Sequence, residues 1–277
     1  MKTMNGHKTS KVLLNLLCIL LCIVILAPLV WIILNSLKTN PELFKNSLSL
    51  PKAWRFDNYA KAWKLGLYRY FGNSVLVSTV SLCAILILSS FLAYGLTRFK
   101  AKGAGIIFVI VLGGMALSEQ VALVPLYKML KSLGIYDTYL AVILPYIAFR
   151  IPFTVFLMRS YFLSIPVELE EAAIVDGYNS FQIFRKIIVP ISKPIFASCA
   201  IVNLNFVWNE FLFANVFLNN KAIQTIPIGL MTFKGDLRTD YTTTLAGLII
   251  ASLPLIILFF CMSKQFVRGL TAGAGKG

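Results

Sequence analysis

The chain has 277 residues, of which 58% are hydrophobic and only 13% are charged. Soluble domains contain about 45–50% apolar and about 25% charged residues, so this composition excludes a soluble globular protein. The formal net charge of +15 fits basic residues that flank membrane spans and meet anionic lipid headgroups. We therefore expect membrane lipid, and no nucleic acid, as the partner of this charge.

Six apolar segments are long enough to cross a membrane as helices, which takes about 20 predominantly apolar residues each. The first, Val12–Leu34, exceeds the roughly 7–15 residues of a signal-peptide core and lacks a small-residue cleavage site, so we interpret it as an uncleaved span. The prediction is an all-α membrane protein in which residues 1–277 form a single transmembrane domain. Its six transmembrane helices are expected near residues 12–35, 72–97, 105–127, 138–161, 188–218 and 242–265.

The short loop between the second and third expected spans bears on orientation. Six spans place both termini on the same side of the membrane, and basic residues summed over whole loops do not decide which side. The loop Arg98–Lys102 contains three basic residues and no acid, and short loops rich in Lys and Arg remain in the cytoplasm. Both termini are therefore expected in the cytoplasm.

No group of residues in the sequence suggests an enzyme or a metal centre. The only histidine, His7, lies near the N-terminus and has no acid or cysteine at a ligand spacing. The five cysteines lie in apolar segments, where they pack as small hydrophobic side chains. We expect no catalytic residue, no metal and no cofactor bound by this chain.

A polar stretch, residues 162–190, separates the fourth and fifth expected spans. Pro166 suits the first turn of a helix, and the three glutamates that follow it would complement the positive end of the helix dipole. Gly177 can adopt a positive φ and end this helix. A narrow face with small side chains would consist of Leu169, Ala172, Ala173 and Asp176.

A second short helix is predicted after this glycine. Ser180 is its expected cap, and Pro190 would break it before the fifth span. Phe181, Phe184 and Ile188 would share one face. From its chemistry alone, the polar stretch fits both an amphipathic elbow resting on lipid and a docking surface for a cytoplasmic protein.

The run Glu171-Ala172-Ala173, followed by Gly177 and by Ile187-Ile188-Val189-Pro190, resembles the EAA loop of bacterial ABC-importer permeases. Among the fixed positions, only Val189 departs from the pattern, where it replaces leucine. The resemblance implies a bacterial cell membrane protein whose coupling segment, residues 165–190, seats as a cytoplasmic coupling helix in a groove of an ATPase subunit. The residues implied to contact the ATPase are Glu171, Ala172, Ala173, Asp176, Gly177 and Pro190.

The resemblance extends over the whole chain and points to the second permease of the carbohydrate, maltose-type branch. It is also carried by Trp54–Tyr59, by Asn203–Phe211 and by the last nine residues, Gly269–Gly277. In related permeases this small-residue tail reaches into the interface between the two ATPase subunits; a frayed terminus is the alternative. Within the tail, residues 266–277, the implied contacts are Gly269, Ala272, Gly273, Gly275, Lys276 and Gly277.

The resemblance implies a larger assembly around this chain. A second permease subunit would complete a heterodimer, two ATPase subunits would bind ATP and Mg, and an extracellular solute-binding protein would deliver a sugar, expected to be an oligosaccharide. This chain has no Walker A motif of its own. The alternatives are a secondary transporter with ion-coupling acids near the midplane, and an ABC permease for a non-sugar solute such as a glycerol phosphate.

Polar side chains expected at membrane depth are candidates for the sugar pathway. Carboxylates and amides bind hydroxyl groups, aromatic faces cover the C–H surfaces of sugar rings, and ionisable groups inside membranes are functional candidates by default. The open alternative is that the amides bridge helices, while Arg150 could pair with either acid. The candidates are Glu119, Gln120, Asn205, Trp208, Asn209 and Glu210.

Two further segments, one in the third span and one in the first outer loop, also lead to expectations. Ser118 and Glu119 replace a Pro-Gly pair that the family commonly has in the third span, so we expect a kink to be lost and an ionisable group to enter the span. In the first outer loop, Leu50–Tyr59 mixes aromatic and charged residues. That mixture suits either the membrane interface or the docking of an external partner.

Overall fold

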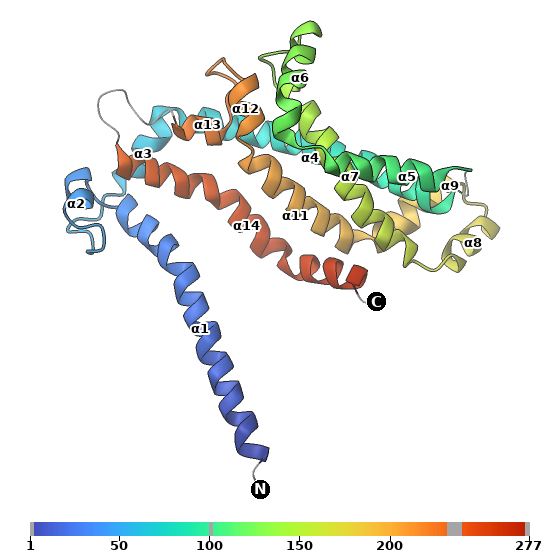
Figure 1. Ribbon diagram of the computed structural model, residues 1–277, viewed down its shortest axis with the longest axis horizontal. Helices are drawn as coiled ribbons and strands as arrows, with labels where there is room; N and C mark the ends of the chain where they lie inside the picture. Colours follow the sequence, from blue (N-terminus) through green and yellow to red (C-terminus); the bar gives the residue numbers. More distant parts are fainter. Residues whose placement is uncertain (1–2, 100–101, 232–239, 275–277) are drawn as a thin grey trace. The chain divides into compact units, whose positions relative to one another are not determined.

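The computed structural model describes residues 3–99, 102–231 and 240–274, with side chains between residues 13 and 262 of these ranges. Every regular element in the described ranges is a helix (Figure 1), which confirms the predicted all-α class. The chain divides into two compact units, residues 1–67 with 230–252 and residues 68–229 with 253–277.

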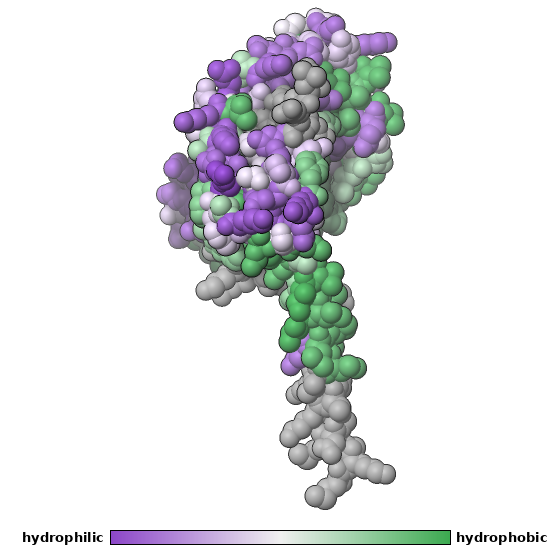
Figure 2. All heavy atoms as spheres, turned by 90° about the vertical axis from the view of Figure 1, so that its left-hand side faces the viewer, coloured by the Kyte–Doolittle hydropathy of each residue, from purple (hydrophilic) through white to green (hydrophobic). Residues whose placement is uncertain are grey.

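The first unit begins with a helix that is apolar on every side. Side chains from Leu13 to Trp31 are exposed and all but Asn15 are apolar, and Figure 2 shows this part of α1 as a largely apolar surface. A helix that is hydrophobic all round belongs in a membrane or in a protein interior, so the predicted first span is confirmed. The elements of this unit are α1 (Thr3–Ser36), α2 (Asn40–Lys45), α3 (Asp57–Ala62), a π-helical turn (Trp63–Leu67) and the start of α14 (Tyr241–Ala274).

The second unit is built around three helices that pack on one another, α4 (Tyr68–Arg98), α7 (Leu140–Leu163) and α11 (Lys193–Asn209). One buried cluster between them includes Tyr146, Phe213 and Phe217, and a second includes Phe162 and Ile188. The shorter helices are α5 (Ala104–Gly113), α6 (Glu119–Ser132), α8 (Glu168–Val175), α9 (Ser180–Ile183), α10 (Val189–Ile191), α12 (Leu212–Phe217) and α13 (Ile226–Met231).

Four helices of the described chain are long and apolar enough to cross a membrane without interruption: Leu13–Ser36, Asp57–Arg98, Leu140–Leu163 and Tyr241–Met262. Two bent pairs raise the number to six if each pair is one span. Ala104–Ala116 and Glu119–Ser132 meet at 97°, and Ser180–Ile191 and Lys193–Asn209 meet at 76°. The expectation of six spans is compatible with this arrangement, whereas continuous third and fifth spans were wrong.

The break in the third span contradicts the expected loss of a kink. Leu117 and Ser118 have extended backbones, with φ/ψ of −75°/120° and −76°/132°. Ser118 occupies the position before the first turn of α6, and its hydroxyl bonds to the Oε1 of Gln120 at 2.6 Å. Serine favours such helix ends over helix interiors, so the residues that replace the Pro-Gly pair still support a break.

The fifth span is also interrupted at places that differ from the prediction. Pro190 lies inside the short helix α10, and the bend follows at Ser192, before Pro194 in the first turn of α11. A proline in a first helical turn has no hydrogen bond to lose, which explains why it starts α11. A second interruption occurs at Glu210, whose extended backbone (ψ 127°) separates α11 from α12.

Candidate functional site

The first helix of the polar stretch forms as its sequence predicts. Helix α8 spans Glu168–Val175, with three glutamates in its first turn. Gly177 has φ +80° and ends the helix. The amide of Tyr178 donates to the carbonyl of Ala173 at 2.9 Å and that of Gly177 donates to Ile174 at 3.0 Å, which is the Schellman pattern.

The second helix begins at Ser180, the residue predicted as its cap. Asn179, rather than Ser180, caps α9: its Oδ1 accepts from the amide of Gln182, and the Gln182 side chain accepts from the amide of Asn179, both at 2.9 Å. This reciprocal pair is a capping box. The prediction missed it because the asparagine directly follows Gly177 and Tyr178 and was assigned to the turn.

Of the residues of this loop that were predicted to contact the ATPase, one is buried and the others are exposed. Ala173 is only 4% exposed and belongs to the buried cluster that includes Phe162. The other predicted residues are exposed, and they are accompanied by exposed apolar side chains at Leu169, Ile174 and Val175. An outward face of this composition can dock a partner protein. The exposed predicted residues are Glu171, Ala172, Asp176, Gly177 and Pro190.

The inward face of α8 carries a glutamate for which the sequence predicted only an interaction with the helix dipole. Glu170 is 7% exposed, and its Oε1 lies 2.5 Å from the Nε of Arg98 at the end of α4. The Nη2 of Arg98 donates to the carbonyls of Phe162 at 3.1 Å and Ile165 at 2.9 Å. The Tyr94 hydroxyl reaches the other carboxylate oxygen at 3.4 Å. Helical spacing, which puts Glu170 and Ala173 on one side, was the available signal.

The predicted tail contacts cannot be described at the side-chain level. Helix α14 continues through Gly269, Ala272 and Gly273 to Ala274, while Gly275, Lys276 and Gly277 lie outside the described residues.

Among the intramembrane candidates, Glu210 has a structural role. It is 7% exposed, accepts the Tyr146 hydroxyl at 2.5 Å, and accepts the amides of Phe213 and Ala214 at 2.8 and 3.2 Å. A carboxylate with these partners satisfies amides in the first turn of α12 that would otherwise be unpaired. Trp208, also buried, meets the ring of Phe71 with centroids 5.7 Å apart.

The two predicted asparagines of α11 are exposed and bond to each other. Asn209 Nδ2 donates to the carbonyl of Asn205 at 2.8 Å and to its Oδ1 at 3.2 Å. Asn203, by contrast, is fully buried and joins α11 to α7, because its Nδ2 donates to the Thr154 hydroxyl at 2.9 Å. That amide bridges helices, as the alternative interpretation allowed.

A cavity of about 260 Å³ opens at the break before α6. Glu119 and Arg150 both line it, together with the rings of Phe149 and Phe153. The Nε of Arg150 donates to Oδ1 of Asn203 at 3.2 Å, which turns the guanidinium to a fixed orientation. Among the described residues neither acid lies within ion-pair distance of Arg150, although Glu119 faces the same cavity, so the suggested pairing stays a prediction. Gln120 is exposed beside this break.

The first outer loop of the other unit is an ordered structure rather than a simple linker. Lys38 is fully buried, and its Nζ donates to the carbonyls of Asn46 at 3.2 Å and Ser47 at 3.1 Å. Thr39 and Glu42 form a capping box at the start of α2. The backbone hydrogen bond from Thr39 holds the pKa of Glu42 below its usual value.

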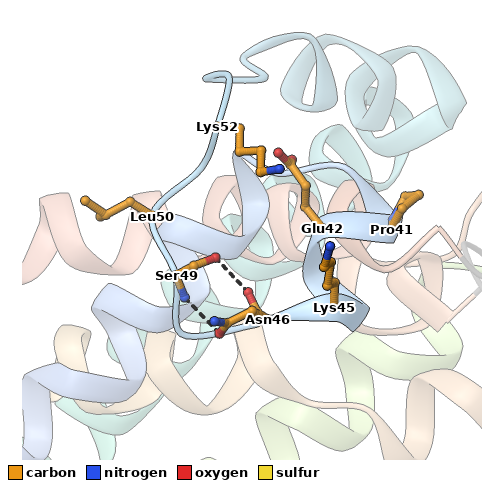
Figure 3. A pocket seen from close by; sticks show the side chains of 7 residues that line it. All are labelled: Pro41, Glu42, Lys45, Asn46, Ser49, Leu50 and Lys52. Atoms are coloured by element: carbon orange, nitrogen blue, oxygen red, sulfur yellow. Dashed lines mark hydrogen bonds between the residues drawn. The ribbon is translucent and has the colours of Figure 1, made fainter.

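A second cavity, of about 330 Å³, lies in this loop. Figure 3 shows Lys52 and Glu42 pointing toward one another across it, and Ser49 bonded to Asn46. Leu48, at 82% exposure, stands out from the same loop. Exposed apolar and basic side chains on an ordered loop can bind another protein. The residues lining the cavity are Pro41, Glu42, Lys45, Asn46, Ser49, Leu50 and Lys52.

Asp240 stabilises the start of α14 in the same unit. It accepts from the Thr243 hydroxyl at 2.7 Å and from the Asn40 side chain at 3.1 Å. Burial raises the pKa of Asp240, but the hydrogen bonds from Thr243, Thr242 and Asn40 together lower it below its usual value.

Comparisons with known proteins agree on one family. Residues 85–271 match the model described as "Binding-protein-dependent transport system inner membrane component". The chain is 48% identical over 255 residues to the probable ABC transporter permease protein YurM of Bacillus subtilis, covering 92% of this chain and 85% of YurM. It is 36% identical over 272 residues to the arabinooligosaccharides transport system permease protein AraQ of the same species, covering 96% of each.

A solved structure shares the fold. The chain superposes with a TM-score of 0.82 on a chain of a bacterial ABC transporter involved in the import of the acidic polysaccharide alginate, at 22% identity, covering 94% of this chain and 98% of that one.

Proposed function

Because this chain belongs to the family of binding-protein-dependent transport system inner membrane components, we propose that it is the permease subunit of an ATP-driven importer of oligosaccharides. The observation that carries this proposal is its similarity, over 96% of both chains, to a permease named for arabinooligosaccharides. A similar relative from Thermococcus litoralis is named for trehalose and maltose. The chain transports and performs no chemistry of its own.

The ATPase partner is assigned to the exposed face of the coupling segment. Helix α8 presents Ala172 without a bulky side chain, between the acids Glu171 and Asp176 and beside the exposed Ile174 and Val175. Such a surface can enter a groove of a neighbouring subunit, because the small side chain permits close backbone approach. Two ATPase subunits that bind ATP and Mg would then serve this permease and its partner, with the tail, residues 266–277, as a second contact.

A second permease subunit is expected to cover the apolar surface of α1 in part. From Leu13 to Leu34 no residue of this span is buried against the rest of the described chain, whereas Asn35 and Ser36 at its end are buried. Lipid can cover such a helix, and so can a related subunit in a heterodimer. With both termini in the cytoplasm, the first outer loop faces outward, where its ordered cavity and the exposed Leu48 and Leu50 would receive the solute-binding protein.

The sugar pathway is assigned to the side of the second unit where its polar residues remain accessible. Glu119 and Arg150 offer acceptors and donors to hydroxyl groups in the cavity at the break, and two phenylalanine rings line it as well. Asn205, Asn209 and Gln120 are exposed and extend this polar lining. The buried Trp208 and Glu210 would shape the pathway from behind rather than touch the sugar.

The test is reconstitution. The chain, co-expressed with its partner permease and ATPase, should take up labelled oligosaccharide into proteoliposomes only when ATP and the loaded binding protein are both supplied. A thermal-shift screen of the binding protein against oligosaccharides selects the cargo. Uptake by this chain alone, driven by an ion gradient, would instead identify a secondary transporter. Deleting residues 269–277 should weaken stimulation of the ATPase; unchanged stimulation would show that the tail makes no functional contact.

A further inference from the structure

We propose that Arg98 and Glu170 form a buried clamp that fixes the coupling helix α8 to the ends of α4 and α7, so that a force applied to α8 moves these helices together. The proposal rests on the coupling role assigned to α8 above. It adds two positioning residues, neither of which is among the residues predicted to contact the ATPase.

The geometry of Arg98 joins three elements through one side chain. Its Nε meets the Glu170 carboxylate at 2.5 Å, and its Nη2 donates to the carbonyls of Phe162 and Ile165. The two carbonyls belong to the last turn of α7 and the residues just after it, where backbone acceptors have no partner within a helix. One guanidinium therefore binds the end of α7 and the start of α8 to the end of α4.

Helix α8 has few other attachments. It is eight residues long, too short to be stable by itself, and the buried residues along it are Glu170 and Ala173. Ala173 contributes only a methyl group to the adjacent cluster. The Glu170 carboxylate, which meets Arg98 and accepts from the Tyr94 hydroxyl, is thus the main polar contact between α8 and the end of α4.

The burial of the pair indicates that it does more than attach α8 to the neighbouring helices. The side chains of Arg98 and Glu170 are 10% and 9% exposed. Apolar residues of similar volume often stabilise a fold as well as a buried ion pair does, because they avoid the cost of removing two charges from water. Only the charged pair, however, fixes both direction and distance, since the planar guanidinium holds several acceptors in defined positions.

The helices that the clamp holds lead to the polar residues within the membrane. Helices α4, α7 and α11 pack on one another, and α7 also carries Tyr146 and Arg150, which bond to Glu210 and Asn203 of the α11 region. If α8 is attached rigidly, its displacement would therefore reach the cavity at Glu119. If α8 were attached flexibly, the loop would absorb the displacement.

The alternative role for Arg98 is orientation of the chain, since it belongs to the basic loop that favours the cytoplasm. Lys102 provides a matched control, because it is an exposed basic residue of the same loop. Neutralising this control residue removes the same charge without touching the clamp.

The experiment measures sugar transported per ATP hydrolysed by the complete transporter in proteoliposomes, together with recovery of the ATPase during purification. Arg98→Gln and Glu170→Gln should each lower this ratio at least about tenfold, because each leaves a buried charge unpaired, while the ATPase still copurifies. Lys102→Gln should leave the ratio within about twofold, as expected for an exposed charge. The exchange Arg98→Glu with Glu170→Arg should recover part of the loss.

A double variant keeps the proposal testable if the single variants fold poorly. Arg98→Met with Glu170→Met replaces the charges by apolar side chains and should assemble, yet remain uncoupled. If it transports with the normal ratio, the pair serves folding only and the clamp is refuted. ATP-dependent uptake that both single variants leave intact would refute the clamp alone. Loss of ATP dependence in the unmodified transporter would refute the proposed function and the clamp with it.

Discussion

A glycine can be required at the end of a coupling helix either because the backbone has a positive φ or because a docking partner needs the space. Gly177 allows these two causes to be tested separately. Its φ of +80° disfavours any residue with a Cβ, at a cost of about 1–2 kcal/mol for the left-handed conformation. A Cβ built at this position meets no atom of the described chain within 4 Å. Within the permease, a substitution therefore costs backbone strain and nothing else, so additional effects must come from the surface that docks there.

Three substitutions distinguish these causes. Gly177→Ala adds strain and one methyl group, whereas Gly177→Asn and Gly177→Asp add bulk with less strain, since both residues tolerate the left-handed region better than alanine. Strain of about 1–2 kcal/mol would lower the folded population of the loop by a factor of about 5–30. If the docking surface dominates, we expect the aspartate variant to lose the most transport, the asparagine variant less, and the alanine variant least.

The assay is ATP-dependent uptake by the reconstituted transporter, with membrane insertion of each variant measured in parallel. Insertion should be normal in all three, because Gly177 is exposed and lies outside the spans. The opposite order, with alanine the most damaging and asparagine nearly normal, would show that the glycine serves only the turn. Unchanged uptake in the aspartate variant would refute the docking role of this loop.

Three further predictions concern other sites. Tyr146→Phe removes a donor from the buried Glu210 carboxylate and should cost about 1–3 kcal/mol, seen as a melting temperature several degrees lower; an unchanged value would mean that the bond adds nothing. Lys38→Met deletes two hydrogen bonds to loop carbonyls, a loss on the order of 2 kcal/mol, so protease should cut the loop near residues 46–50 faster; equal rates would contradict this. Asp240 has a lowered pKa, chiefly because hydrogen bonds from Thr243 outweigh burial. A group with a lowered folded pKa stabilises the fold above its unfolded pKa of about 3.9 and loses this effect as pH falls through the folded value. Amide exchange at Thr243 should thus be protected equally at pH 7 and pH 5 after correction for intrinsic rates, and a loss of protection already at pH 5 would refute the assignment.

The sequence predicted those features that depend on local pattern. Apolar length located α1 and α7, and the spacing from Pro166 to Gly177 predicted α8 and its end, because caps and left-handed glycines act within a few residues. The break near Ser118 escaped prediction, and the break predicted at Pro190 falls at Ser192 instead, since hydrophobicity averaged along a segment does not report backbone direction. At each break a serine lies directly before the start of a helix. This local signal is lost when hydrophobicity is averaged along the segment.

Pairings between distant residues were the least predictable part of the site. Arg98 was counted as a loop charge that sets orientation, although its side chain binds a carboxylate 72 positions further along the chain. The sequence left open which acid Arg150 could pair with, and it gave no sign that the Arg150 Nε would donate to the amide oxygen of Asn203. Charge complementarity alone cannot choose among such partners, because the helix that carries each candidate must first be rotated and placed by packing.

The break before α6 gives a physical reason why the transport path should pass this point. Inside a bilayer, irregular backbone is tolerated only where protein covers it or where it lines an aqueous cavity. Leu117 and Ser118 interrupt the helix, and the cavity beside them contains a carboxylate and a guanidinium that do not neutralise each other directly. Lipid tails can satisfy neither the backbone nor the charges. Water and a polar solute can satisfy both, which supports the proposed sugar pathway past Glu119.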